Sequence, residues 1–150
     1  VSGSLGSDNS IEKFSFSNVN LLPLICYESI YGESGLQKKI NLISVITNDG
    51  WWKETAGYKQ HFAYSRLRSV EQRKTIIRSA NTGISGVIDE RGNILKQTKW
   101  DEETVFSVNV NTNENSTFYN KYGDYIGRIS SFISVLFILM LLVRKIKNPS

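Results

Sequence analysis

The stretch "LLPLICYES", residues 21–29, joins an apolar run to a polar one, and the only cysteine of the chain stands at the boundary. The apolar part has the length of a β-strand, although Pro23 is unfavourable in the middle of a central strand. Cys26 comes where the run ends, and Tyr27 and Glu28 follow at once. The pattern therefore predicts a strand with Cys26 at its carboxyl end.

The segments that follow predict alternating helices and strands. "NLISVITND", residues 41–49, is apolar nearly throughout, which is typical of a strand buried on both faces. Residues 29–40 between the two strands could form a short helix. Residues 58–73 are expected to form an amphipathic helix. Its apolar stripe would consist of Phe62, Ala63, Leu67 and Val70.

The remaining segments favour short strands around this pair. Residues 1–10 are small and polar and are expected to be loop, residues 11–19 alternate as in a half-buried strand, and residues 111–125 are polar and irregular. Four further strands are predicted within "TIIRSAN" (75–81), "GISGVID" (83–89), "NILKQT" (93–98) and "TVFSVNV" (104–110), with a hairpin turn at 89–93. The order indicates a layered α/β sheet.

The end of the chain has a different character. "ISSFISVLFILMLLV", residues 129–143, contains no charge and lies between Arg128 and Arg144. A buried C-terminal helix of a soluble protein is the alternative, but such a helix keeps a polar face, whereas this one is apolar all round. The pattern predicts a membrane-spanning helix, and divides the chain into a domain over residues 1–125 and a helix with a basic tail over 126–150.

The orientation of this helix follows from the basic tail. Arg144, Lys145 and Lys147 come directly after the apolar run and are expected on the cytoplasmic side. The preceding domain would then be extracytoplasmic. The bias is modest, because Lys121 and Arg128 lie on the other side of the run.

Charge and composition restrict the partners. The chain has 18 Lys and Arg against 14 Asp and Glu, and three of the basic residues belong to the C-terminal tail. No basic stripe is left for nucleic acid, which is excluded as a partner. The chain starts at Val1 and has its only methionine at Met140, so it is expected to be a piece of a longer polypeptide.

Two residues could supply nucleophilic chemistry. Cys26 is either a core residue or a nucleophile, and as a nucleophile it needs a neighbouring cation and a base. Glu28 is close in sequence, but no lysine is. His61 is the only histidine; it could pair with Cys26 or take part in a hydrogen-bond network. One histidine and one cysteine do not make a zinc site, so no metal and no cofactor are predicted.

Other polar and aromatic residues leave alternatives open. Trp51 and Trp52 lie in a loop and could cover a pocket or meet a membrane surface, or one of them could pack into the core. Glu71 is expected to be exposed or ion-paired, with Arg68 or Lys74. "RSANTG", residues 78–83, could line a site or form a turn.

Together these motifs resemble a known family. C-Y-E after the first strand, N-D-x-W after the next, Q-H-F on the helix, R-S-x-N-x-G after the third strand and the closing apolar helix are similar to the C-terminal part of the apolipoprotein N-acyltransferases. These are bacterial inner-membrane enzymes of the nitrilase (carbon-nitrogen hydrolase) superfamily. The resemblance runs from about residue 20 to the end of the chain.

The resemblance implies the later portion of a nitrilase α-β-β-α sandwich followed by one transmembrane helix. Cys26 matches the family's nucleophile, and Tyr27 and Glu28 match the next two motif residues, with the Tyr27 N–H helping to form the oxyanion hole. The family's Glu base and its Lys lie N-terminal to the cysteine, and residues 1–25 contain no match for either. The chain alone is therefore expected to be inactive. Lys53 stands where many relatives have Gly.

The implied reaction is a two-step acyl transfer. The Cys26 thiolate would attack an ester of a phospholipid acyl donor, and the resulting thioester would acylate the amine of a diacylglyceryl apolipoprotein. Two alternatives remain. A nitrilase-type amide hydrolase would use the same cysteine, but the membrane helix argues against it. A truncated, non-catalytic chain would explain the missing Glu and Lys.

Overall fold

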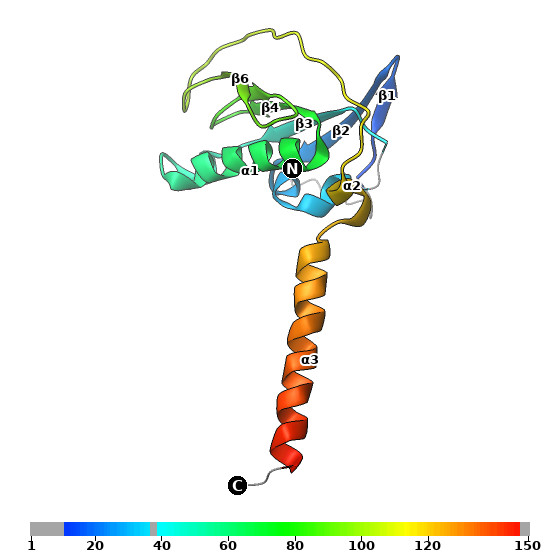
Figure 1. The fold of residues 1–150 in the computed structure, drawn as a ribbon. Helices are drawn as coiled ribbons and strands as arrows, with labels where there is room; N and C mark the ends of the chain where they lie inside the picture. The colour runs from blue at the N-terminus through cyan, green and yellow to red at the C-terminus, as the bar shows by residue number, and fades with distance from the viewer. Residues whose placement is uncertain (1–10, 37–38, 148–150) are drawn as a thin grey trace, which may run out of the picture.

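The computed structural model describes residues 11–36 and 39–147, and the predicted loop at residues 1–10 lies outside them. A six-stranded mixed sheet with the strands in sequence order forms the centre of the molecule (Figure 1). Its strands are β1 (Phe14–Phe16), β2 (Val19–Ile25), β3 (Leu42–Thr47), β4 (Thr75–Ala80), β5 (Gly86–Ile88) and β6 (Ile94–Gln97). The expected α/β class is confirmed.

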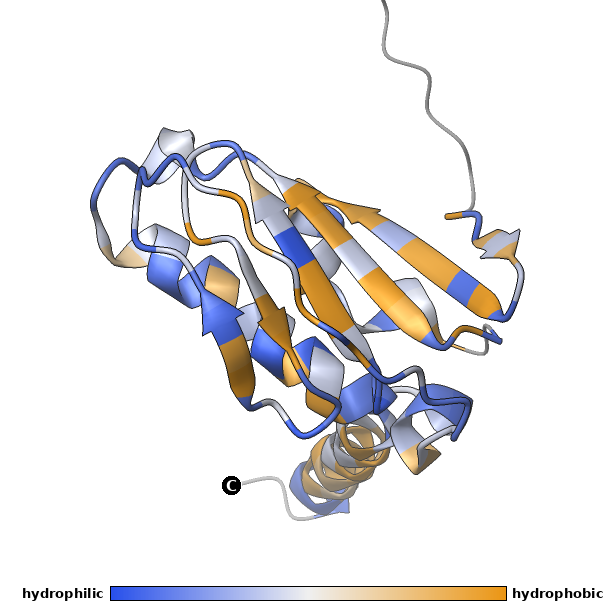
Figure 2. Cartoon of the chain, turned by 90° about the horizontal axis from the view of Figure 1, so that it is seen from above, coloured by the Kyte–Doolittle hydropathy of each residue, from blue (hydrophilic) through white to orange (hydrophobic). Residues whose placement is uncertain are grey.

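The three central strands run parallel and hold the core. Leu22 pairs with Ile43, and Ile43 pairs with Ile76, so one face of the sheet presents a continuous apolar row. The core comprises Leu22, Leu24, Ile40, Ile43, Val45, Phe62, Ile76 and Ile88. Figure 2 shows this apolar centre, with hydrophilic residues in the surrounding loops. Because β2, β3 and β4 are parallel, their carboxyl ends meet at one edge of the sheet.

Helix α1 (Ala56–Gln72) covers one face of the sheet. It begins where the Thr55 hydroxyl accepts a hydrogen bond from the Gly57 N–H. Its buried residues are Tyr58, His61, Phe62, Ser65, Arg68, Ser69 and Gln72. The predicted apolar stripe is therefore wrong except at Phe62, because Leu67 and Val70 are exposed. The buried face of the helix consists mostly of polar side chains that form hydrogen bonds, such as His61 and Ser65.

Two other predicted elements have a different form. The described residues 29–36 and 39–40 contain no α-helix, where a short helix is predicted. Two short 3₁₀ turns, η1 (Cys26–Ile30) and η2 (Gly32–Gly35), occupy the first part of this range. Residues 104–110 are not a strand. They cross the outer face of the sheet above Ile77 instead of lying beside an edge strand, so their backbone cannot join the ladder.

A short helix, α2 (Phe118–Tyr122), connects the sheet layer to the final helix. The Asn120 amide donates to the carbonyl of Gly35 at 3.1 Å and to the side chain of Gln72, and the Thr117 hydroxyl donates to the carbonyl of Glu71 at 2.5 Å. These bonds fix α2 to the carboxyl end of α1.

The last helix, α3 (Tyr125–Lys147), extends away from the domain (Figure 1). It has 23 residues, so it is about 34 Å long, enough to cross a hydrocarbon core of about 30 Å. None of its most apolar window is buried, and its composition fits a membrane span. The charge-free run alone would be too short, and the helix gains the missing length from residues on both flanks.

Candidate functional site

Cys26 lies directly after β2, at the carboxyl edge of the sheet. Its backbone has φ +52°, a left-handed conformation that non-glycine residues adopt rarely and that is concentrated at functional sites. This turn ends the strand and leaves the thiol half-buried instead of enclosed in the core. Cys26 therefore stands at the tip of a strand, as the sequence predicts.

The turn is stabilised from within by the residues that follow. The Glu28 carboxylate accepts a hydrogen bond from the Ile25 N–H at 2.6 Å, and the Ser29 hydroxyl donates to the Cys26 carbonyl at 2.7 Å. Ser29 is completely buried. The Glu28 carboxylate is thus hydrogen-bonded to the backbone of Ile25, the last residue of β2.

His61 lies beneath this turn and is 1% exposed. Its Nδ1 is 2.8 Å from Asp49 Oδ1, and its Nε2 is 3.1 Å from Ser29 Oγ and 3.3 Å from the Cys26 carbonyl oxygen. No hydrogen bond joins His61 to the Cys26 sulfur in the described part of the chain. Of the two interpretations of His61, the structure shows the hydrogen-bond network.

Asp49 and Arg78 complete the network, and both are fully buried as side chains. Arg78 Nη2 donates to Asp49 Oδ2 at 2.6 Å, Nη1 donates to Ser65 Oγ at 3.2 Å, and Nε donates to the Ile84 carbonyl at 3.1 Å. The carboxylate also accepts from the Thr47 hydroxyl at 3.0 Å. Asp49 is thereby shared between the ends of two neighbouring strands and α1.

The glycine of "RSANTG" makes room for this carboxylate. Gly83 has φ +128°, and a Cβ there would meet Asp49 Oδ2 at 2.6 Å. Sequence reasoning did not assign Asp49 or Arg78. The available signal was the placement of polar residues, "TND" and "RSAN", at the ends of two adjacent parallel strands, which meet at one edge of a sheet.

Electrostatics keep this network ionised. Burial raises the pKa of Asp49, but the hydrogen bond from His61 and the charge of Arg78 outweigh it, so that this pKa lies below its ordinary value. Burial lowers the pKa of Arg78 below its ordinary value, and the charge of Asp49 partly opposes that shift. Arg78 is therefore a buried cation whose counter-ion is Asp49.

The two tryptophans of the loop after β3 have different environments. The ring of Trp52 lies 5.3 Å from the His61 ring and 5.6 Å from the Tyr27 ring, between centroids. Trp51 is 86% exposed. Trp52 and Tyr27 therefore cover the buried histidine, and Trp51 projects into the surroundings.

Glu71, at the other end of α1, forms an ion pair with Arg68 at 3.0 Å. Burial raises the pKa of Glu71, and the charge of Arg68 opposes that shift. Its sequence interpretation as an ion-paired helix residue agrees with this contact.

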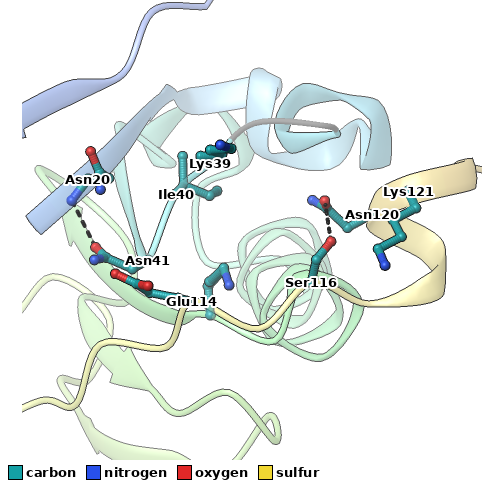
Figure 3. Close-up of a pocket in the computed structure, with 9 residues that line it drawn as sticks. Asn20, Lys39, Ile40, Asn41, Glu114, Ser116, Asn120 and Lys121 are labelled. Carbon is teal, nitrogen blue, oxygen red and sulfur yellow. Dashed lines mark hydrogen bonds between the residues drawn. The ribbon is translucent and has the colours of Figure 1, made fainter.

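The part of the chain that the structure describes contains no group of three or more His, Cys, Asp and Glu side chains placed to hold a metal. A cavity of about 620 Å³ lies at the opposite edge of the sheet from Cys26, near the start of β2 and beside α2 (Figure 3). Cys26 is not among its lining residues.

The structure thus places a cysteine on a strand-end turn above a buried Asp–His–Arg network, at the carboxyl edge of a layered α/β sheet. A model of the carbon-nitrogen hydrolase family matches residues 3–117. The chain belongs to the carbon-nitrogen hydrolase family.

Two curated relatives carry the resemblance further. The chain is 38% identical over 104 residues to the apolipoprotein N-acyltransferase of Geobacter metallireducens, covering 67% of this chain and 20% of the relative. It is 31% identical over 142 residues to that of Thermotoga maritima, covering 90% of this chain and 28% of the relative. The predicted resemblance is confirmed, and the chain spans between a fifth and three tenths of these relatives' length.

Solved structures agree on the fold. A carbon-nitrogen hydrolase from Helicobacter pylori G27 matches with a TM-score of 0.55 at 17% identity, covering 66% of this chain and 43% of that one. An amidase from Nesterenkonia sp. matches with a TM-score of 0.53 at 18% identity, covering 65% and 40%. The nitrilase-like fold is therefore confirmed for the sheet layer, and α3 follows it.

Proposed function

We propose that this chain is the cysteine-bearing part of a lipoprotein N-acyltransferase. In this reaction Cys26 attacks the ester carbonyl of a phospholipid, the lysophospholipid alkoxide leaves with a proton, and an acyl thioester forms. The amine of an S-diacylglyceryl cysteine at the N-terminus of an apolipoprotein then attacks the thioester. The amide forms and the thiol is regenerated.

The observation that carries the proposal is the placement of Cys26 on the left-handed turn at the carboxyl end of β2. The turn presents the thiol at the sheet edge, and the following residue, Tyr27, would direct its N–H toward the developing oxyanion.

The membrane helix supports lipid substrates over a soluble amide. Both proposed substrates reside in a bilayer, and α3 would hold the domain of residues 1–125 at its surface. We place the protein in the bacterial inner membrane, with this domain extracytoplasmic and the tail of 126–150 ending in the cytoplasm. The assignment of the acceptor rests on the similarity to the named N-acyltransferases.

The proposal assigns the general base and the oxyanion lysine to residues N-terminal to Cys26 in a longer polypeptide. In the described residues, Glu28 accepts from the Ile25 N–H and His61 is bonded to Asp49, and neither is hydrogen-bonded to the thiol. The 150-residue chain alone is expected not to form the thioester.

The test compares the 150-residue chain with its full-length parent. Each is incubated in detergent with phosphatidylethanolamine, and intact-mass spectrometry detects an acyl adduct that hydroxylamine removes. The adduct is expected on the parent, and its loss is expected on Cys26→Ala. Cys26 is the only cysteine of this segment, so the adduct can be located by peptide mapping.

Two results would contradict the proposal. An adduct that survives Cys26→Ala would assign the nucleophile to another residue. Release of ammonia from small amides by a parent that forms no lipid adduct would identify the amide hydrolase instead. An adduct on the isolated chain would show that the base lies within these 150 residues.

A further inference from the structure

The cavity at the amino edge of the sheet is separate from the site at Cys26. Its wall combines residues from the start of β2, the segment before β3, and the segment around α2 (Figure 3). Its lining comprises Asn20, Lys39, Ile40, Asn41, Lys74, Glu114, Ser116, Asn120 and Lys121. Helix α1 separates the two sites, because its first residues lie near Trp52 and its last residues near Asn120.

The cavity wall is cationic. Lys39, Lys74 and Lys121 line it, opposed only by the carboxylate of Glu114. Lys74 is 3% exposed, and its Nζ donates to the carbonyl of Asn115 at 2.6 Å, which leaves two of its three N–H groups for other acceptors. No Lys74–Glu114 ion pair within 4 Å is present in the described residues.

The neutral part of the wall is already hydrogen-bonded. The Asn41 side chain accepts from the Asn20 N–H at 2.8 Å and donates to the Asn18 carbonyl at 2.7 Å. The Ser116 hydroxyl donates to Asn120 Oδ1 at 2.9 Å. The ammonium groups of the three lysines are therefore the charged donors available to a ligand. An anion with several acceptor oxygens would match them.

The cavity is lined by α2, which directly precedes α3, so a membrane crossed by α3 would lie close to it. Lys121 of α2 is four residues before Tyr125, the first residue of α3. The rings of Phe118, Tyr122 and Tyr125 cluster where α2 meets α3, with the Phe118 centroid 4.4 Å from that of Tyr122 and 4.9 Å from that of Tyr125. Phe118 and Tyr122 are largely exposed, as aromatic side chains at a membrane–water interface are.

We propose that this cavity binds the phosphate group of an anionic phospholipid headgroup, with Lys39 and Lys121 at its mouth and Lys74 at its wall. The headgroup would come from the leaflet on the domain's side. The site lies at the far end of α1 from Cys26, so it is no part of the acyl-transfer centre, and the proposal is independent of the proposed function.

The test uses the full 150-residue chain in a neutral detergent. Native mass spectrometry counts the lipids retained during titration with dioleoylphosphatidylglycerol, with dioleoylphosphatidylcholine as the zwitterionic comparison. A calorimetric titration with inorganic phosphate distinguishes a headgroup site from a site for the free anion. The basic tail is kept in every variant, so its own contribution to lipid binding is constant.

The variant Lys39→Gln/Lys121→Gln removes two charges from the cavity, and Lys59→Gln/Lys99→Gln removes two exposed charges elsewhere. Each lysine near an anionic lipid surface contributes about a fivefold change in affinity, so the cavity pair should weaken phosphatidylglycerol binding about twenty-five-fold. The control pair should leave this affinity nearly unchanged. Thermal unfolding checks that both variants fold as the parent chain does.

Glu114→Gln gives a test with the opposite sign. Removing the one carboxylate of the wall should strengthen phosphatidylglycerol binding severalfold, which a purely structural role of Glu114 would not produce. Equal losses in the cavity and control pairs, or no gain in Glu114→Gln, would overturn the proposal. If inorganic phosphate binds as tightly as the lipid, and the same substitutions change its affinity in the same way, the ligand is the free anion and not a lipid headgroup.

Discussion

The position of the Cys26 thiol depends on Ser29 of its own turn and on side chains from α1, β4 and the end of β3. The Ser29 hydroxyl donates to the Cys26 carbonyl, His61 lies beneath the same turn, and His61 Nδ1 is 2.8 Å from Asp49 Oδ1. These contacts connect the turn at Cys26 to the buried Asp49–Arg78 ion pair. Neutralising one member of the ion pair should therefore also disturb the conformation of the turn.

Asp49→Asn should lower the free energy of unfolding by about 3–5 kcal/mol, because it leaves the buried Arg78 cation without its counter-ion. Urea titration of the detergent-solubilised chain, followed by circular dichroism, measures the change. Asp101→Asn is the matched control, since Asp101 is exposed and asparagine tolerates its left-handed backbone. A loss below about 1 kcal/mol would contradict the structural importance of the pair.

The same carboxylate should make stability depend on acid. The pKa of Asp49 is lower in the folded state than in the unfolded state, so its contribution is fully present above the unfolded value. That contribution is lost as pH falls from about 4 through the folded pKa. Unfolding free energies measured between pH 6 and pH 2 should fall less steeply for Asp49→Asn than for the unchanged chain. Parallel curves would disprove the linkage.

The adjacent tryptophans offer a matched pair of substitutions. Trp52→Ala should cost roughly 2 kcal/mol, about half the loss of a fully buried aromatic, because its ring packs on Tyr27 and His61. Trp51→Ala should cost less than about 0.5 kcal/mol, since this side chain is 86% exposed. Thermal melts of the two variants measure this difference. Equal losses of stability would contradict the different burial of the two tryptophans.

At the scale of elements, the buried central strands could be predicted well, whereas the strand predicted at residues 104–110 and the buried face of α1 could not. The apolar runs at residues 21–25 and 42–47 have the composition of buried strands, and both are strands. The face of α1 was assigned by apolar spacing, which cannot identify buried polar residues such as Ser65 and Arg68. Ser65 accepts a hydrogen bond from Arg78 of β4, a partner 13 residues away that no local sequence pattern indicates.

The two faces of α1 give an element-scale prediction. Phe62→Ala should lower the free energy of unfolding by about 3–4 kcal/mol, because Phe62 belongs to the core cluster. Leu67→Gln should change it by less than about 0.5 kcal/mol, because Leu67 is exposed. Chemical denaturation of both variants provides the comparison. A larger loss of unfolding free energy for Leu67→Gln than for Phe62→Ala would indicate that the apolar stripe predicted from sequence is the buried face.

At the scale of the whole molecule, the chain combines a nitrilase-like α/β layer with a long apolar helix. The nitrilase-like layer and the terminal helix were both predictable, the first from motifs and the second from a charge-free run. The docking of α2 was not, because Asn120, Gln72 and Gly35 are far apart in sequence and meet only through tertiary hydrogen bonds.

The orientation of α3 can be tested with fusions after Ser150. Arg144, Lys145 and Lys147 should keep this end in the cytoplasm, so a green fluorescent protein fusion should fluoresce and an alkaline phosphatase fusion should be inactive. A fusion partner placed before residue 11 should give the reverse pattern. Active phosphatase at the C-terminus would invert the topology and place Cys26 on the cytoplasmic side.

A change of angle at the junction between α2 and α3 would displace the far end of α1. Gly123, with φ +65°, is the residue from which α3 departs, and α1 lies across the direction of α3 (Figure 1). His61, beneath the turn of Cys26, is eleven residues from Gln72 at the α2 dock, about 17 Å along the helix. A tilt of about 10° at this junction would therefore move the His61 end of α1 by about 3 Å, comparable to the separation of two atoms about to react. If Cys26 acts as proposed, the height of its thiol above the bilayer is thus set at the opposite end of the domain, where α2 meets α3.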